Sequence, residues 1–213
     1  MSIYIFDDFD AISDTQLSKI RKIAPAARRN KIDTCRFRED KLLSAVAHLL
    51  MQKALHGRTP LYHSYGKPYA KGIEFNLSHC RMCAVIITAD EACGIDVEAV
   101  RDFDRNIIPL CFTKSEQRQL ADASECNDLF FRLWTLKESY IKNVGEGLSH
   151  DLLSVSFDLT GESIRCSDKF YHFSTFLYGG KYRISYCVKK SDGKQAITVV
   201  NWRELTDVTY TIA

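Results

Sequence analysis

The sequence predicts an α+β protein built from two similar halves, residues 1–105 and 106–213. Each half contains one long segment whose apolar residues recur at helical spacing, at 36–55 and at 127–144. Short strand-like segments bounded by glycine and proline accompany both helices. A chain of 213 residues is long enough for one large domain or for two small domains packed together.

The first half is expected to begin with a strand at 2–6 and a short helix capped by Ser13 or Asp14. After Pro25, a small basic cluster precedes the long helix, which is expected to stop at Gly57. A turn-rich loop then leads to three consecutive strands, expected at 73–78, 82–88 and 94–97.

In the second half, a helical segment at 107–121 is broken by Pro109 and restarts at Thr113, whose spacing to Glu116 is that of a capping box. The long helix follows. Gly179-Gly180 is a two-residue hairpin signal. Four strands are expected in this half, at 153–159, 170–178, 181–188 and 196–202.

The composition is that of a soluble globular protein, with 46% hydrophobic and 26% charged residues. A formal net charge of +2 is too small to predict binding to nucleic acid or to a membrane. The sequence starts without the features of a signal peptide and contains no apolar run of about 18 residues, so a cytoplasmic protein with reduced cysteines is expected. Cys80 and Cys83 lack a second ligand pair at the spacing of a zinc site.

Asp96 and Glu98 alternate with apolar residues at the end of the third expected strand, so both project from one face. Two carboxylates held this close repel each other unless a cation lies between them. A site with few oxygen ligands from the protein suits Mg²⁺. The alternative interpretation is a solvated strand end.

Glu138 and Lys142 lie one turn apart on the second long helix and share a face. Glu138 is a candidate third carboxylate, and Lys137 and Lys142 would place positive charge beside a phosphate. A carboxylate cage rimmed by lysines fits phosphoryl transfer, in which catalysis is mostly positioning and charge neutralisation. The alternative is a surface Glu–Lys pair worth only about 0.3–0.5 kcal/mol.

Two further stretches offer groups that bind anions. Lys67 lies in a tight Gly-Lys-Pro loop, and Asn76-Leu77-Ser78-His79 ends a strand with three polar side chains. A lysine and an imidazole are suitable partners for a terminal phosphate. The alternatives are an ordinary turn lysine and a hydrogen-bonded histidine at a strand end.

These stretches occur in one order: the Gly-Lys-Pro loop, Phe75 to His79, Gly94 to Glu98, and Trp134 to Lys142. Together they resemble the motifs of the 4'-phosphopantetheinyl transferases. The length resembles the surfactin-synthetase-activating (Sfp) type, a monomeric pseudo-dimer, rather than the short trimeric type. The last two motifs are specific as a pair, and the first two support them.

The resemblance implies an enzyme that moves the phosphopantetheine arm of coenzyme A to a serine of an apo acyl or peptidyl carrier protein, with release of 3',5'-ADP. It implies a coenzyme A site at the interface of the two halves. It also implies Mg²⁺ bound by Asp96, Glu98 and Glu138, and Lys142 near the reacting phosphate. Either Lys142 or Glu138, through a water, then helps to deprotonate the serine.

The resemblance further implies a set of residues that bind coenzyme A. These are Arg28, Lys31, Ser44, Lys67, Ser78, His79 and Lys137. The run from Glu39 to Ser44 lacks the arginine that the family often carries there, so Ser44 is expected to offer a hydroxyl to the phosphate. Lys137 meets the substrate or faces solvent, and the role of Glu116 is left open.

Two other functions remain open on the sequence. One is a different Mg²⁺-dependent phosphoryl-transfer enzyme that acts on nucleotides without a carrier protein. The other is an inactive module that binds coenzyme A or a carrier. The residues do not distinguish carriers of fatty-acid, polyketide and peptide synthases.

Overall fold

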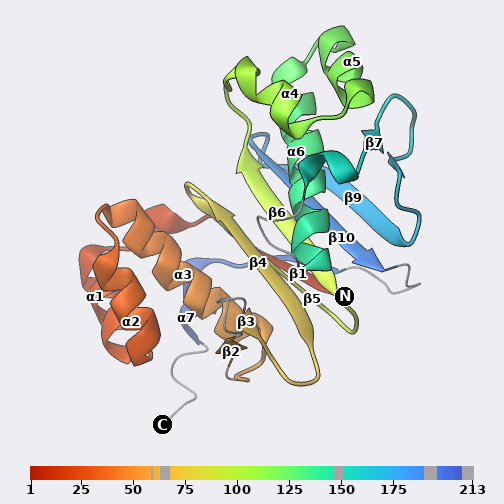
Figure 1. Ribbon diagram of the computed structural model, residues 1–213. Coiled ribbons are helices and arrows are strands. Elements are labelled where there is room, and N and C mark those ends of the chain that lie inside the picture. Colours follow the sequence, from red (N-terminus) through yellow and green to blue (C-terminus); the bar gives the residue numbers. More distant parts are fainter. Residues whose placement is uncertain (59, 63–67, 146–150, 190–195, 208–213) are drawn as a thin grey trace. The chain divides into compact units, whose positions relative to one another are not determined.

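The computed structural model describes residues 1–58, 60–62, 68–145, 151–189 and 196–207 (Figure 1). The chain divides into two compact units, one of Met1–Asp90 with Lys194–Ala213 and the other of Glu91–Gly193. Helices and mainly antiparallel sheets occur in both units, which confirms the α+β class. Within the described residues, no helix has the length and apolar character needed to cross a membrane.

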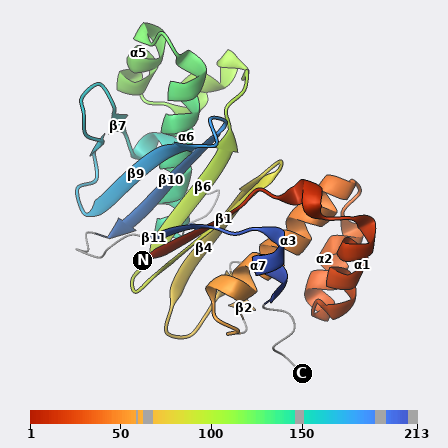
Figure 2. The same ribbon diagram turned by 180° about the vertical axis from the view of Figure 1, so that it is seen from behind.

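The first unit contains a four-stranded sheet and a group of helices. Its described elements, in chain order, are β1 (Ser2–Phe6), a 3-10 helix (Phe9–Ala11), α1 (Asp14–Ile23), α2 (Ala26–Thr34), α3 (Arg38–Ala54), β2 (Leu61–Tyr62), β3 (Pro68–Tyr69), β4 (Glu74–Cys80), β5 (Cys83–Ala89), β11 (Ala196–Val199) and α7 (Trp202–Thr206). The sheet order is β11-β1-β5-β4. In Figure 2, β11 runs beside β1 and leads to α7.

Local sequence accounts for the helix ends of the first unit. Ser13 forms a capping box with Gln16 at the start of α1, which confirms that prediction. Helix α3 ends at Ala54, and His56 (φ +50°) and Gly57 (φ +77°) follow in the left-handed conformation. Their backbone amides donate to the carbonyl oxygens of Lys53 and Gln52 and so close the helix end. Helix α3 is apolar along most of its length and packs against β5. It therefore supplies much of the core of this unit.

The second unit contains a three-stranded sheet covered by one long helix. Its described elements, in chain order, are β6 (Cys93–Ala99), a 3-10 helix (Arg105–Ile107), α4 (Ile108–Cys111), α5 (Lys114–Asp122), α6 (Cys126–Val144), a second 3-10 helix (Leu152–Ser154), β7 (Phe157–Asp158), β8 (Arg165–Cys166), β9 (Tyr171–Tyr178) and β10 (Tyr182–Lys189). The sheet order is β6-β10-β9. Figure 1 shows α6 lying along this sheet, and its contacts are with β6 and β10.

The two units repeat one topology. In each, a first strand is followed by helices that include one long helix, and then by an antiparallel hairpin. The second strand of the hairpin pairs antiparallel with the first strand of the unit, which gives the orders β1-β5-β4 and β6-β10-β9. This repetition confirms the expectation of two similar α+β halves.

Four expectations differ from the structure. The segment 153–159 is a 3-10 turn and the two-residue strand β7 rather than one strand. The last strand ends at Val199, because Asn201 caps α7 with Glu204 in a second capping box. The division between the units falls after Asp90 rather than after residue 105, because β6 pairs with β10. The last strand, expected in the second half, belongs to the first unit, because β11 pairs with β1.

Candidate active site

Strand β6 and helix α6 pack with direct backbone contact. A Cβ atom added at Gly94 would lie 2.0 Å from the carbonyl oxygen of Ser139 and 2.7 Å from the amide nitrogen of Asn143. The Asn143 side-chain amide donates to the carbonyl oxygens of Ala92, at 3.1 Å, and Cys187, at 2.9 Å. These contacts fix the last turns of α6 over β6.

Asp96 lies on the face of β6 that α6 covers. Its register partner on β10 is Ser185, whose hydroxyl is 2.6 Å from the hydroxyl of Thr135 on α6. The Lys142 ammonium donates to Asp96 Oδ1 at 2.5 Å. Asp96 is only 5% exposed, so this ion pair is largely shielded from bulk water.

Glu138 interacts electrostatically with both carboxylates of the strand, Asp96 and Glu98. Burial raises the pKa of Glu138, and the charges of Asp96 and Glu98 raise it further, while Lys142 opposes them. Glu98 accepts a hydrogen bond from the Arg101 guanidinium at 2.9 Å. Asp96, Glu98, Glu138 and Lys142 therefore lie on the facing sides of β6 and α6 in one unit.

The carboxylates of this site can hold a hard cation only if water supplies the remaining ligands. Among the described residues, no three His, Cys, Asp or Glu side chains form a preassembled metal cluster. Mg²⁺ is usually held by one or two carboxylates and keeps several of its waters, so it does not require such a cluster. Three carboxylates facing two cations, Lys142 and Arg101, also leave an excess of negative charge. The assignment of Asp96, Glu98 and Glu138 to Mg²⁺ stays a prediction.

Lys137 has a different environment from the one expected. Its side chain is fully buried, so the solvent-facing alternative is wrong. The ammonium lies 2.9 Å from Glu116 Oε2 and donates to the carbonyl oxygens of Leu152 and Val155 at 2.7 and 2.6 Å. Burial lowers the pKa of Lys137, and the charge of Glu116 opposes this. We therefore do not propose that Lys137 contacts coenzyme A.

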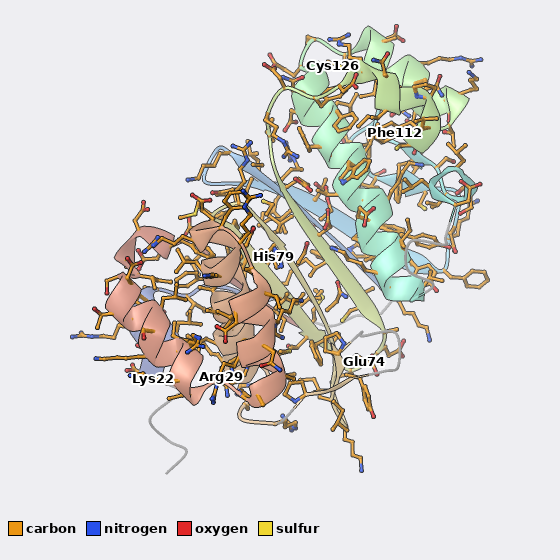
Figure 3. All side chains as sticks on the ribbon, turned by 60° about the vertical axis from the view of Figure 1, so that its left-hand side comes forward. Lys22, Arg29, Glu74, His79, Phe112 and Cys126 are labelled. Atoms are coloured by element: carbon orange, nitrogen blue, oxygen red, sulfur yellow. The ribbon has the colours of Figure 1, made fainter. Side chains whose placement is uncertain are left out.

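The first unit has a pocket of about 310 Å³ between α2, α3 and β4. Four residues assigned above to coenzyme A line it, namely Arg28, Lys31, Ser44 and His79. Arg28 and Lys31 lie three residues apart on one face of α2, and His79 (labelled in Figure 3) lies near the end of β4. Apolar side chains complete the wall, among them Leu43, Ala47, Met51, Phe75 and Leu77.

The pocket suits a ligand that combines an anionic group with a flat or apolar part. The Ser44 hydroxyl is buried and has no hydrogen-bond partner among the described residues. Such a group is costly to bury unless a ligand or water satisfies it. With Arg28 and Lys31 at the same pocket, an acceptor such as phosphate is the fitting partner.

The other residues assigned to coenzyme A are placed differently. Ser78 is buried in β4 and is not among the residues that line the pocket. Lys67 lies outside the described residues. The sequence did not assign Asp40 and Asn76, which also line the pocket. Asn76 could have been identified from the sequence, because it lies within the stretch Phe75 to His79 that was already assigned to anion binding.

Comparison with known proteins identifies the class. The model of the 4'-phosphopantetheinyl transferase superfamily matches residues 92–200, about half of the chain. This range contains Asp96, Glu98, Glu138 and Lys142. The chain therefore belongs to the 4'-phosphopantetheinyl transferase superfamily, a class of transferase enzymes.

One curated relative supports this membership. The chain is 32% identical over 151 residues to 4'-phosphopantetheinyl transferase Sfp of Bacillus subtilis (strain 168), covering 66% of this chain and 67% of the relative. It is 24% identical over 217 residues to 4'-phosphopantetheinyl transferase ffp of Bacillus subtilis, covering 91% and 95%. Among solved structures, holo-[acyl-carrier-protein] synthase (AcpS) of Thermotoga maritima aligns with a TM-score of 0.42 and 20% identity, over 47% of this chain and 63% of that chain.

Proposed function

We propose that the protein transfers the 4'-phosphopantetheine arm of coenzyme A to a serine hydroxyl of an apo acyl or peptidyl carrier protein, with Mg²⁺ and with release of 3',5'-ADP. One observation carries this proposal. Within the segment that matches the superfamily, α6 packs directly on β6 and places Glu138 and Lys142 beside Asp96 and Glu98.

The carboxylates are proposed to hold the metal. Asp96 and Glu98 extend from one face of β6, and Glu138 comes from the helix above. Bound to these oxygens, Mg²⁺ would supply positive charge to the pyrophosphate of coenzyme A. Lys142, whose ammonium already lies at Asp96, would add its charge next to the same phosphate.

The serine hydroxyl must lose its proton when it attacks phosphorus. In this step a serine oxygen–phosphorus bond forms and the bond from phosphorus to the departing 3',5'-ADP breaks. Lys142 donates to Asp96 and therefore acts as a cation in this arrangement. Glu138 is the better proposal for the group that accepts the serine proton, directly or through a water.

The pocket of the first unit is proposed to bind the nucleotide end of coenzyme A. Arg28, Lys31 and His79 would contact its 3'-phosphate, and the Ser44 hydroxyl would complete the hydrogen bonding. The apolar wall fits the adenine ring. Lys67 keeps its proposed role at the same phosphate.

The test is incubation of the protein with coenzyme A, Mg²⁺ and a panel of apo carrier proteins from fatty-acid, polyketide and peptide synthases. The expected result is a mass gain of one phosphopantetheine on the carrier serine, abolished by chelation of Mg²⁺ or by changing that serine to alanine. Nucleotide turnover without any modified carrier would instead favour a different phosphoryl-transfer enzyme. Tight binding of coenzyme A with no turnover on any carrier would favour an inactive binding module.

Some parts of the proposal stand on the sequence alone. A monomeric state, a cytoplasmic location and the lack of nucleic-acid or membrane partners stay predictions. Gel filtration and cell fractionation test the first two directly.

A further inference from the structure

Glu116 and Lys137 form a buried ion pair on the side of α6 that faces away from the sheet. Both side chains are fully inaccessible to solvent, and Lys137 Nζ lies 2.9 Å from Glu116 Oε2. The Lys137 ammonium also donates to the carbonyl oxygens of Leu152 and Val155. A lysine has three donors, so all of them are used within the protein.

The carboxylate of Glu116 is equally well satisfied. Its Oε2 atom accepts from the backbone amide and the hydroxyl of Thr113, at 2.8 and 2.9 Å, and so completes the capping box of α5. Its Oε1 atom accepts from the amide of Phe157 at 2.9 Å. Phe112 (labelled in Figure 3) lies under the pair, with its ring 5.8 Å from Lys137 Nζ. One ion pair thus joins α5, α6 and the segment around β7.

The pair holds α6 at the residue next to Glu138. Consecutive helical residues point about 100° apart, so fixing the direction of Lys137 also fixes the direction of Glu138. Tyr140 holds the helix at a second place, because its hydroxyl donates to Asp168 at 3.0 Å and its ring packs against Tyr171 of β9. On the sheet side, Asn143 holds the same helix to Ala92 and Cys187. The ion pair of Lys137 on one side and the hydrogen bonds of Asn143 on the other leave α6 little freedom to rotate about its axis.

Stability alone does not explain a buried ion pair. Two apolar side chains of similar volume often serve as well or better, because burying two charges is costly. An ion pair whose donors and acceptors are all hydrogen-bonded fixes one relative orientation of the elements that carry it.

We propose that Glu116 and Lys137 are positioning residues, which set the rotation of α6 that brings Glu138 over the carboxylates of β6. This inference rests on the proposed function. Lys137 acts through the helix rather than through contact with substrate. Disturbing the pair therefore weakens metal binding and turnover and leaves coenzyme A affinity unchanged.

The experiment compares Glu116→Gln, Lys137→Met and the double variant. Glu116→Gln is the milder change, because it keeps the size of the side chain and its amide oxygen can still accept from Phe157. Its NH2 group replaces Oε2, so the charge and the acceptor for Thr113 and Lys137 are lost together. Each folded variant is tested for Mg²⁺ affinity by calorimetry without substrates, and for kcat and KM for coenzyme A. Asp158→Asn is the matched control, since Asp158 forms an exposed ion pair with Arg165 in the same unit.

The expected result for Glu116→Gln is a loss of about 10-fold or more in Mg²⁺ affinity and in kcat, with KM for coenzyme A unchanged. Lys137→Met should lose more, because Glu116 is left as a buried charge without a partner. The double variant should recover part of that loss, because the unpaired charge is removed. If Lys137→Met does not fold, the Mg²⁺ affinity and kcat of Glu116→Gln and of the double variant test the inference.

Three results would overturn the inference. The first is a folded Glu116→Gln variant with wild-type Mg²⁺ affinity and kcat. The second is a Lys137→Met variant whose KM for coenzyme A rises while kcat stays, which indicates direct substrate contact. The third is a wild-type protein that binds no Mg²⁺, since Glu138 would then have no ligand to hold. If the wild type binds Mg²⁺ but modifies no carrier, the proposed function fails and the calorimetric comparison still tests the positioning role.

Discussion

Gly94 and Ser139 lie so close that a Cβ on the glycine would be 2.0 Å from the serine carbonyl oxygen. No side chain fits between strand β6 and helix α6 at this point. The helix therefore lies nearer to the strand than two elements with intervening side chains would allow. This close approach brings the Lys142 ammonium to 2.5 Å from Asp96 Oδ1 and places Glu138 within the field of both strand carboxylates.

Gly94→Ala should destabilise the protein and impair the site together. The added methyl group would clash with backbone atoms, which cannot rotate away, so we expect a loss of about 2–4 kcal/mol in the free energy of unfolding. Urea denaturation measures this loss. Gly161→Ala is the control, because its Cβ would be 3.8 Å from the nearest atom, on the Arg165 side chain, and should change stability little. Equal stability of the two variants would contradict the packing argument.

Removing the site carboxylates should abolish transfer without unfolding the protein. We expect Asp96→Ala and Glu138→Ala to lower kcat by about 100-fold or more, because charge neutralisation at the phosphate is lost. Carrier modification followed by mass spectrometry measures the rate, and circular dichroism checks the fold. Asp158→Ala removes an exposed carboxylate of the same unit and should retain full activity. Folded Asp96 and Glu138 variants that transfer normally would rule out the metal assignment.

The pocket of the first unit should distinguish coenzyme A from its analogue without the 3'-phosphate. Arg28→Ala and His79→Ala are expected to raise KM for coenzyme A by about 10-fold each, the effect of losing a charge-assisted hydrogen bond. The same changes should leave KM for 3'-dephospho-coenzyme A almost unchanged. Arg29→Ala is the control on α2, because that guanidinium donates to the carbonyl oxygens of Lys22 and Ala24. An equal rise in KM for both substrates would place the phosphate elsewhere.

The stability of the protein should fall below neutral pH because of His48. This imidazole is 4% exposed on α3, and burial, with a contribution from Arg28, lowers its pKa to about 4. The unfolded chain therefore takes up the proton first, near pH 6.5, while the folded protein resists it until about pH 4. The contribution of His48 to stability is therefore constant above pH 6.5 and falls by about 3 kcal/mol between pH 6.5 and 4.

The His48 prediction is checked by measuring unfolding free energies across this pH range. Acidic groups also titrate in the lower part of the window, so the informative quantity is the difference between wild type and His48→Gln. That difference should change by about 3 kcal/mol from pH 6.5 to 4. A difference independent of pH would mean that the imidazole is not buried in neutral form.

Most elements of the fold were predictable because their signals are local. Helical spacing identified α3 and α6, and the capping box of Thr113 and Glu116 located the start of α5. At α1 the sequence offered Ser13 or Asp14 as the cap, and the structure has Ser13. Local sequence patterns did not predict which strands pair when the two strands are far apart along the chain. Strand β11 pairs in parallel with β1, nearly the whole chain away, and no local pattern of 196–199 reveals that partner.

For the candidate site, the sequence predicted which residues share a face of one strand or helix, but not what covers that face. Alternation placed Asp96 and Glu98 on one face, and helical spacing placed Glu138 and Lys142 together. Spacing also put Lys137 in the same segment, but it does not tell which side of the helix is covered. The segment 152–157 and Glu116 cover that side, so Lys137 is buried and paired instead of exposed.

The sequence by itself determined the α+β class, the family resemblance and the types of group at the site, since these follow from patterns of neighbouring residues. Only the tertiary structure decided which of those groups meet. The contact of Gly94 with α6, the pairing of Lys142 with Asp96 and the meeting of Arg28, Ser44 and His79 at one pocket each join residues from separate elements. Such contacts depend on how helices pack on sheets, and packing joins side chains that are distant along the chain.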